Sequence, residues 1–438
     1  MLTAGWGGYP RAESRWLRSH AAGDVAAMLA AGPLVARGGG CAYGDAAIGC
    51  DATLMTAGLD RMIDFDPASG LLTVEAGVLL RDVIRAFLPR GFFPPVVPGT
   101  QNVSIGGMIA SHVHGKNHHA VGGFGAHVES LVLIGPDRAA LRCSTSENSA
   151  LFWATLGGMG LTGVITQASF RLIPVETGLI RQQTIVAPDL DAALAALDQS
   201  SHWTYAVGWI DTLARGAALG RSLIYLGEHA RAAEVDGRRE PAARDGAVLG
   251  IPFDLPDFTV NRLSVRAFNT AYHLAGTLAA ADRLVPFEPY FFPLDAVGDW
   301  KRVFGRRGLV QHQCVIPRSQ GRRVLAEVLE LIARRGCPSF LAVLKLFGPD
   351  PSPLMAFPME GYTLAVDFPA SQETFEMLDA IDEQLRGVGG RIYLAKDARQ
   401  SRATLEAGYP GLAAFRDLRR TQGASKVFMS RQSERLGL

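Results

Sequence analysis

The sequence has few cysteines, and its first residues lack the pattern of a secretion signal. Five cysteines occur in 438 residues, and no two of them form a C-x-x-C pair. An odd count without paired spacing argues against a disulfide framework and favours a reducing compartment. The N-terminus "MLTAGWGGYPRAESRW" lacks a basic segment followed by an apolar run, so no signal peptide is expected. We therefore expect a cytoplasmic or peripherally membrane-associated protein.

The sequence also has no excess of positive or negative charge. The net charge is +1, so no basic field favours nucleic acid as a partner. Two long segments, 91–115 and 148–170, contain no charged residue at all. Prolines and polar groups interrupt the first and glycines the second, so neither predicts a transmembrane segment. Charge-poor, glycine-rich backbone instead suits the close approach of a large buried ligand.

The pattern of apolar residues and glycines changes near residue 175. Up to that point short apolar runs alternate with glycine turns, and residues 71–91 predict a strand, a turn and a helix. Residues 176–390 alternate helix-like repeats with strand-like runs such as "LVQHQCVIP", which predicts an antiparallel sheet with flanking helices. Within them, the apolar, basic segment 250–300 is either a flexible lid or a contact with a lipid surface. The expected fold class is α+β.

Three glycine-rich motifs differ in what they predict. "GMGLTG" at 158–163 matches G-x-G-x-x-G, but a helix precedes it and a strand follows, which is the wrong order for a dinucleotide fingerprint. No phosphate-binding G-x-x-x-x-G-K-[ST] occurs. "ARGGGCAYGD" at 36–45 offers a nest of N–H groups for a pyrophosphate, and "PGTQNVSIGGMIASHVHGKNHH" at 98–119 adds further donors. Together these two loops predict a large phosphate-containing cofactor.

Four histidines fall within eight residues, at His112, His114, His118 and His119. A zinc or copper site is one interpretation of such a cluster. Adjacent histidines diverge on a strand, however, and no carboxylate or cysteine lies close in sequence to complete a tetrahedral set. We therefore expect no metal and prefer a loop that faces a cofactor.

The order of the motifs resembles the vanillyl-alcohol-oxidase superfamily of FAD flavoproteins. The similarity lies in "RGGG…YGD", "TVEAGV", "PGT…SIGGMIA…HGKNHH" and "LFWATLGGMGLTGVIT". "KLFGP", "VDFP" and "AKDAR" are similar to its polyprenylphosphoryl-pentose-oxidising branch. This resemblance implies a two-subdomain FAD-binding domain of PCMH type over 1–175, a substrate domain over 176–390, and a return of residues 391–438 to the FAD domain.

The resemblance also implies a set of residues that bind FAD. Many relatives tether the flavin to a histidine just after the first glycine loop, where this chain has Cys41, so noncovalent FAD is expected and a thioether to Cys41 is the alternative. The expected FAD-binding residues are Arg37, Gly38, Gly39, Gly40, Cys41, Ala42, Tyr43, Gly99, Thr100, Gln101, Asn102, Ser104, Gly106, Gly107, Ala110, His114, Gly115, Asn117, Gly163, Ile165 and Tyr393.

Catalytic and substrate-binding positions follow from the same resemblance. Lys396, His114 and Lys116 match active-site positions, with either His114 or Lys396 as the base and Lys396 as a stabilising charge. A surface Lys396 paired with Asp397 is the structural alternative. The expected substrate-binding residues are Tyr43, Gln311, Gln313, Lys345, Ala365 and Lys396. Mycobacterial relatives carry a cysteine where this chain has Ala365, so no thiol chemistry is expected there.

The implied activity is oxidation of the 2′-hydroxyl of a polyprenylphosphoryl ribose to the 2′-keto sugar, by hydride transfer to flavin N5. This is the first half of an epimerisation to the arabinose form for cell wall arabinan, with an NADH-dependent short-chain reductase as the expected functional partner. An alditol or aldonolactone oxidase of the same fold that uses oxygen is the alternative. Contact with a membrane periphery suits a lipid-linked substrate.

Overall fold

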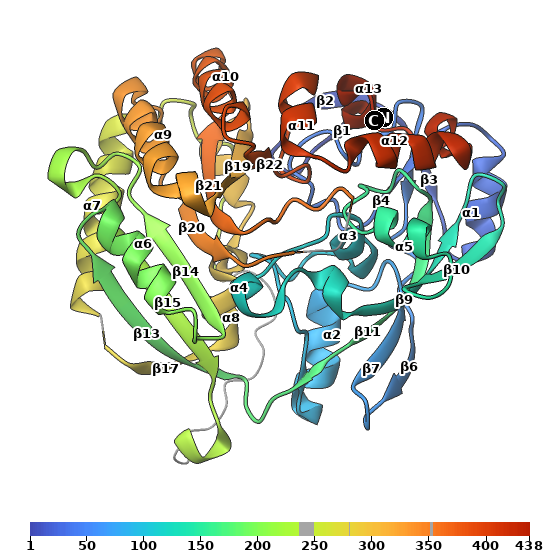
Figure 1. Ribbon diagram of the computed structural model, residues 1–438, viewed down its shortest axis with the longest axis horizontal. Coiled ribbons are helices and arrows are strands. Elements are labelled where there is room, and N and C mark those ends of the chain that lie inside the picture. Colours follow the sequence, from blue (N-terminus) through green and yellow to red (C-terminus); the bar gives the residue numbers. More distant parts are fainter. Residues whose placement is uncertain (236–248, 280, 351–353) are drawn as a thin grey trace.

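The computed structural model describes residues 1–235, 249–279, 281–350 and 354–438, and three sheets form its framework (Figure 1). The remaining residues, which fall within the expected substrate domain and include one position of the apolar segment 250–300, lie outside the described part. Mixed helices and sheets confirm the α+β class.

The first sheet is parallel and leads into the first glycine loop. Its order is β3 (Arg15–Arg18), β5 (Ala52–Met55), β4 (Leu34–Arg37). Because parallel strands need a crossover connection, α1 (Ala22–Leu29) lies between β3 and β4, which flank β5 on either side. The glycine loop starts where β4 ends, and the carboxyl ends of parallel strands are where α/β sheets commonly bind ligands.

The second sheet is antiparallel and carries the second glycine loop. Its order is β10 (Ala140–Ser144), β9 (Val128–Ile134), β11 (Val164–Arg171), β7 (Leu71–Glu75) and β6 (Met62–Asp66). As predicted, a helix, α5 (Ser149–Thr155), precedes "GMGLTG" and β11 follows it.

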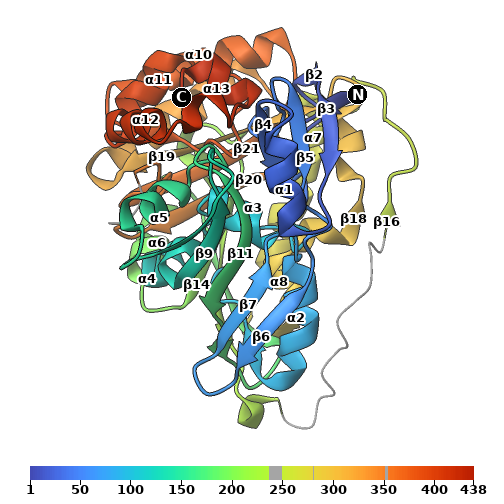
Figure 2. The ribbon, with the colours of Figure 1, turned by 90° about the vertical axis from the view of Figure 1, so that its right-hand side faces the viewer.

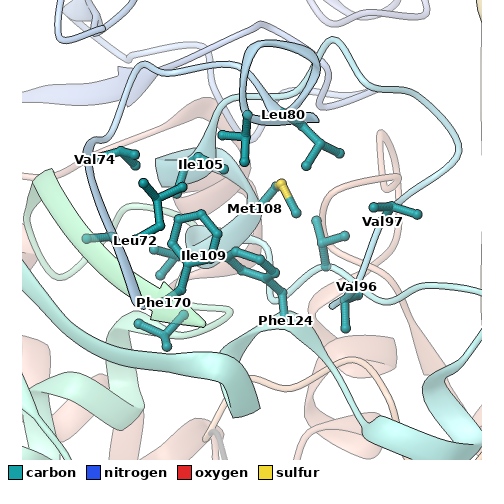
Figure 3. Close-up of a cluster of buried hydrophobic side chains, with 14 of the residues drawn as sticks. Leu72, Val74, Leu80, Val96, Val97, Ile105, Met108, Ile109, Phe124 and Phe170 are labelled. Atoms are coloured by element: carbon teal, nitrogen blue, oxygen red, sulfur yellow. The ribbon is translucent and has the colours of Figure 1, made fainter. Parts of the chain in front are cut away.

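Two short helices anchor the second loop to this sheet. They are α2 (Leu80–Phe87) and α3 (Ile105–Ala110). Ile105, Met108 and Ile109 of α3 point into a cluster of buried side chains that includes Leu72 and Phe170 from the sheet (Figure 3). The loop therefore rests on a packed base.

The third sheet has eight strands, all of whose pairings are antiparallel. Helices α6 (Leu190–Gln199), α9 (Gly321–Arg335) and α10 (Gln372–Arg386) bury their apolar sides against one face of it. In sheet order the strands are β17 (Arg283–Pro286), β13 (Leu179–Ala187), β15 (Ser222–His229), β14 (Tyr205–Ile210), β20 (Ala342–Phe347), β21 (Gly361–Pro369), β19 (Leu309–Pro317) and β22 (Arg391–Ile392).

The last helices lie beside the first strands of the chain (Figures 1 and 2). They are α11 (Arg402–Gly408), α12 (Leu412–Thr421) and α13 (Arg431–Leu436). Between α12 and α13 the backbone bridges from Phe428 to Leu34 and from Ser430 to Gly49. The domain boundaries at 175 and 390 stay predictions.

Candidate active site

A cavity of about 1010 Å³ lies between both glycine loops and the third sheet. All three predicted catalytic residues and every predicted substrate-binding residue line it. Of the expected FAD-binding residues, two, Arg37 and Asn117, are not part of its lining. The expected FAD-binding residues that line the cavity are Gly38, Gly39, Gly40, Cys41, Ala42, Tyr43, Gly99, Thr100, Gln101, Asn102, Ser104, Gly106, Gly107, Ala110, His114, Gly115, Gly163, Ile165 and Tyr393.

The two glycine loops interlock through Ser104. Its hydroxyl accepts the N–H of Gly39 at 3.4 Å and, as the N-cap of α3, the N–H of Gly107 at 3.3 Å. A Cβ on Gly38 would lie 1.9 Å from that hydroxyl oxygen, and one on Gly39 would lie 2.5 Å from the carbonyl oxygen of Asn102. Glycine is therefore required at both positions for the loops to meet.

The first loop has the donors that a diphosphate needs. Among the described residues, the N–H groups of Gly38, Gly40, Cys41 and Ala42 donate to no other residue. Consecutive unpaired N–H groups form an anion-binding nest. The chain thus fits the diphosphate of FAD with backbone rather than with charged side chains.

The surroundings of the Cys41 thiol indicate whether it could attach FAD covalently. Its thiol contacts the carbonyl oxygen of Asn102 at 3.3 Å, and burial raises its pKa to about 11. A protonated thiol is a poor nucleophile. The geometry therefore favours noncovalent FAD, which stays a prediction.

The side chains of Arg37 and Asn117 make hydrogen bonds to backbone carbonyl oxygens of the protein. The Arg37 guanidinium donates to the carbonyl oxygens of Ala4 at 3.0 Å and Ala47 at 3.3 Å, and the Asn117 amide donates to Pro95 at 2.8 Å. Both side chains shape the backbone around the cavity, and their contacts with FAD stay predictions.

His114 lies in the cavity wall with both ring nitrogens engaged. Nε2 lies 2.9 Å from Nε2 of Gln313, and Nδ1 lies 3.1 Å from Nζ of Lys345. Burial and the charge of Lys345 hold the pKa of His114 well below its usual value, so the ring is neutral. A neutral ring has one N–H and one lone pair, so either Lys345 is an uncharged amine or the Gln313 amide is turned to present its oxygen.

The other three histidines do not converge with His114. His112 and His118 share one oxygen of Asp350, at 2.8 and 3.2 Å, and His119 contacts the backbone oxygen of Trp203 at 2.8 Å. His118 and His119 begin the short helix α4 (His118–Val121) rather than lying on a strand. The described ranges contain no group of three or more side chains arranged as metal ligands. The metal interpretation of four converging imidazoles is therefore not supported by this geometry.

Three lysines give the cavity its charge. Burial lowers the pKa of Lys116 and of Lys345 to about 7, and that of Lys396 to about 8. The charge of Lys396 lowers the pKa of Lys345, and that of Lys345 lowers the pKa of Lys116. An anionic ligand relieves both burial and repulsion, so the cavity favours anions. Lys116 also donates to the backbone oxygen of Tyr290 and lies over its ring, 4.5 Å from the centroid.

Lys396 faces a second buried group that the sequence prediction missed, Asp367. Nζ of Lys396 lies 3.7 Å from the ring centroid of Tyr43, and it makes no hydrogen bond within the described residues. Burial raises the pKa of Asp367 to about 7, although Gln311 and Lys396 oppose the shift. One Asp367 oxygen is buried without a partner in the described chain. The signal was present, since Asp367 belongs to the quoted motif "VDFP".

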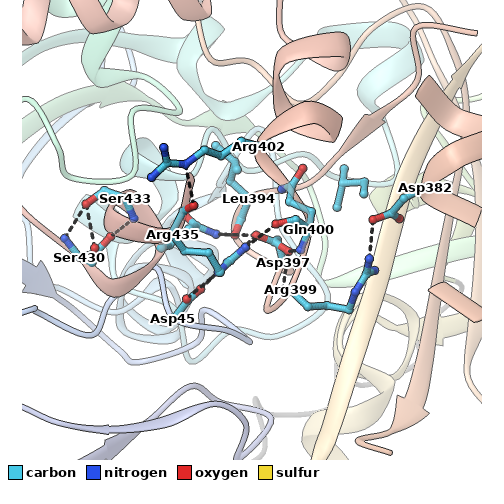
Figure 4. A network of polar contacts seen from close by, with 12 residues as sticks. Asp45, Asp382, Leu394, Asp397, Arg399, Gln400, Arg402, Ser430, Ser433 and Arg435 are labelled. Atoms are coloured by element: carbon cyan, nitrogen blue, oxygen red, sulfur yellow. Dashed lines mark hydrogen bonds and ion pairs between the residues drawn. The ribbon is translucent and has the colours of Figure 1, made fainter. Parts of the chain in front are cut away.

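The position of Lys396 is fixed from the C-terminal helices (Figure 4). Arg435 of α13 donates to Asp45, which follows the first glycine loop, and to Asp397, each at 2.8 Å. Burial alone would raise the pKa of Asp397, but Arg435 and backbone N–H groups outweigh it and hold that pKa below its usual value. Asp397 is thus the partner of Arg435, and the alternative of a surface Lys396 paired with Asp397 was wrong.

Fold and site together define an FAD-binding oxidoreductase of the vanillyl-alcohol-oxidase type. Residues 24–144 match the FAD binding domain family. The chain is 33% identical over 413 residues to decaprenylphosphoryl-beta-D-ribose oxidase of Mycolicibacterium smegmatis, with 92% of this chain and 89% of the relative covered. It is 24% identical over 407 residues to L-gulono-1,4-lactone dehydrogenase of Mycobacterium tuberculosis, with 91% and 89% covered. The chain belongs to the decaprenylphosphoryl-ribose oxidase family and is an FAD-dependent oxidoreductase that acts on a CH–OH group.

Proposed function

We propose that the chain oxidises the 2′-hydroxyl of a polyprenylphosphoryl ribose to the 2′-keto sugar, the first half of an epimerisation to the arabinose form. The carrying observation is that three lysines and two glutamine amides line the same cavity as the two glycine loops. Lysines suit a phosphate, and amides suit sugar hydroxyls. Bound FAD supplies the acceptor for the hydride that leaves the sugar carbon.

Lys396 is the base in this proposal, rather than His114. Both ring nitrogens of His114 are engaged by Gln313 and Lys345, and its pKa lies well below the usual value. Lys396 has a pKa of about 8, so a substantial fraction of its amine is neutral near that pH. The neutral amine takes the hydroxyl proton, and the Asp367 carboxylate stabilises the ammonium that results.

The remaining polar groups bind the substrate. Gln311 donates to Asp367 and lies 3.4 Å from the Tyr43 hydroxyl, so it connects these two buried side chains. Lys345 and Lys116 supply positive charge for the sugar phosphate. Ala365 leaves the wall without a thiol, so an inhibitor that forms an adduct with cysteine at this position should bind without its covalent step.

The proposed product requires a second enzyme. A keto sugar becomes the epimer only when a hydride is returned to the opposite face of the same carbon. An NADH-dependent short-chain reductase is the class of partner that suits this step, and it is part of the proposal.

An anaerobic visible spectrum tests the proposal. Polyprenylphosphoryl ribose should bleach the flavin band of the purified protein, while the arabinose epimer, offered as the matched control, should bleach it far more slowly. A flavin band unchanged by the ribose substrate would refute the assignment of substrate.

A second candidate activity is oxidation of an alditol or aldonolactone with oxygen, which the similarity to L-gulono-1,4-lactone dehydrogenase favours. It needs no phosphate or lipid. Oxygen consumption with L-gulono-1,4-lactone but no bleaching by the phosphorylated sugar would select this alternative.

A further inference from the structure

Helix α7 (Arg262–Leu278) has two opposite apolar sides. Val265 and Asn269 are buried on the inner side, and a Cβ on Gly276 would lie 2.2 Å from Leu223 of β15. The spacing i, i+4, i+8, i+11, i+15 places a second set of apolar residues on the outer side. This set is Leu263, Ala267, Ala271, Leu274 and Leu278.

The outer side is exposed to an unusual degree. Leu263 is 80% exposed, Leu274 58% and Leu278 81%. Two phenylalanines that precede the helix, Phe253 and Phe258, are 62% and 77% exposed. Seven of the eleven exposed large hydrophobic side chains of the described chain fall between residues 253 and 278, so exposed apolar side chains are concentrated in this segment. We call the three exposed leucines on the outer side of α7, Leu263, Leu274 and Leu278, the apolar ridge.

The charge around the ridge is positive. Helix α7 contains no aspartate or glutamate, and its two charged residues, Arg262 and Arg266, are exposed. The acidic residues nearest in sequence, Asp257 and Asp282, lie beyond the two ends of the helix. A helix with an apolar outer side and a basic flank is typical of binding in the plane of an anionic bilayer surface. In the described part of the chain, no helix meets the length and apolar composition needed to cross a membrane.

The same helix forms part of the cavity wall. Tyr272 lines the cavity, its ring centroid lies 4.8 Å from that of Trp209 in a tilted arrangement, and its hydroxyl contacts the Tyr225 hydroxyl at 3.1 Å. Arg283, at the start of β17, lines the cavity as well. Helix α7 therefore borders the cavity with its inner side and carries the ridge on its outer side.

We infer that the apolar ridge docks onto an anionic lipid bilayer, so that the cavity beside α7 receives its substrate from the membrane. Delivery of a lipid-linked substrate from the membrane rests on the proposed function, whereas the exposure of the ridge and the charge of α7 are independent of it. A second copy of the chain is the competing occupant, and self-association without vesicle binding would identify it.

Vesicle co-sedimentation of the FAD-loaded full chain tests this inference. Vesicles of phosphatidylcholine with a minority of phosphatidylglycerol should bind the protein, and vesicles of phosphatidylcholine alone should bind it less. The variant L263Q/L274Q/L278Q should lose about tenfold in partitioning for each leucine. R262E/R266E should remove the preference for anionic vesicles, and Ile63→Gln, which removes a half-exposed hydrophobic side chain elsewhere, should bind like the original chain.

Flavin content and far-UV circular dichroism establish that each variant is folded. Oxidation of a short-chain, water-soluble polyprenylphosphoryl ribose should be equal in the original chain and the triple variant, because none of the three leucines lines the cavity. Oxidation of the long-chain substrate in vesicles should fall only in the variant. If neither the original chain nor the triple variant oxidises the soluble substrate, the proposed function is contradicted. The result of the vesicle-binding experiment still stands in that case. Equal sedimentation of the original chain and the triple variant would overturn the inference, as would self-association that the triple variant abolishes without any vesicle binding.

Discussion

Replacing Gly38 by alanine should weaken FAD binding without unfolding the protein. A Cβ at this position would lie 1.9 Å from Oγ of Ser104, whereas ordinary contacts begin at 3.4 Å. The two loops must therefore separate by the difference, about 1.5 Å, or the Ser104 side chain must leave the cap of α3. Overpacking of this kind typically costs about 1–3 kcal/mol. If that cost falls on the bound state, the Kd for FAD rises by about 5- to 150-fold.

The assay is the Kd for FAD, measured by quenching of flavin fluorescence on titration with apoprotein. Gly23→Ala is the matched control, because its added Cβ would meet nothing within 4 Å. The double variant G38A/S104A should recover only part of the affinity, since Cβ of Ser104 would still lie 2.9 Å away. An unchanged Kd in G38A would show that the loops do not need to interlock to hold FAD, and it would refute this reasoning.

Three further predictions concern Lys396 and its surroundings. Lys396→Met should lower the anaerobic rate of flavin reduction by about 10²- to 10⁴-fold while FAD stays bound, and a rate within a few-fold of the original would exclude it as the base. Asp367→Asn removes a carboxylate that raises the pKa of Lys396, so the rise of that rate with pH near 8 should move to lower pH. A shift to higher pH, or none, would contradict this coupling. Arg435→Met leaves Asp45 and Asp397 buried without their cation, so the free energy of unfolding should fall by about 3 kcal/mol in a urea titration. An unchanged unfolding midpoint would show that these two ion pairs do not stabilise the fold.

Local signals predicted the parts of the site that depend on backbone. The two glycine loops are visible in sequence because unhindered N–H groups and tight turns need consecutive glycines. That these loops and Lys396 line one cavity followed from a family resemblance, not from spacing.

The missed contacts are those that join distant parts of the chain. Asp350 meets His112 across 238 positions, and Arg435 meets Asp45 across 390. No periodicity encodes such pairs, because they depend on how separate sheets pack. Helix α7 was ambiguous for another reason: a helix that is apolar on two sides has the sequence pattern of a buried one, and only burial in the fold distinguishes the outer side.

The ion pairs that Arg435 makes with Asp45 and Asp397 have a consequence for when the cofactor site is complete. The first glycine loop emerges from the ribosome early, yet Asp45 and Asp397 gain their shared cation only when residue 435 has been made. The surroundings of the first glycine loop are therefore complete only after α13 has docked. Chains truncated before residue 435 should retain less FAD than the full chain, although both glycine loops are present.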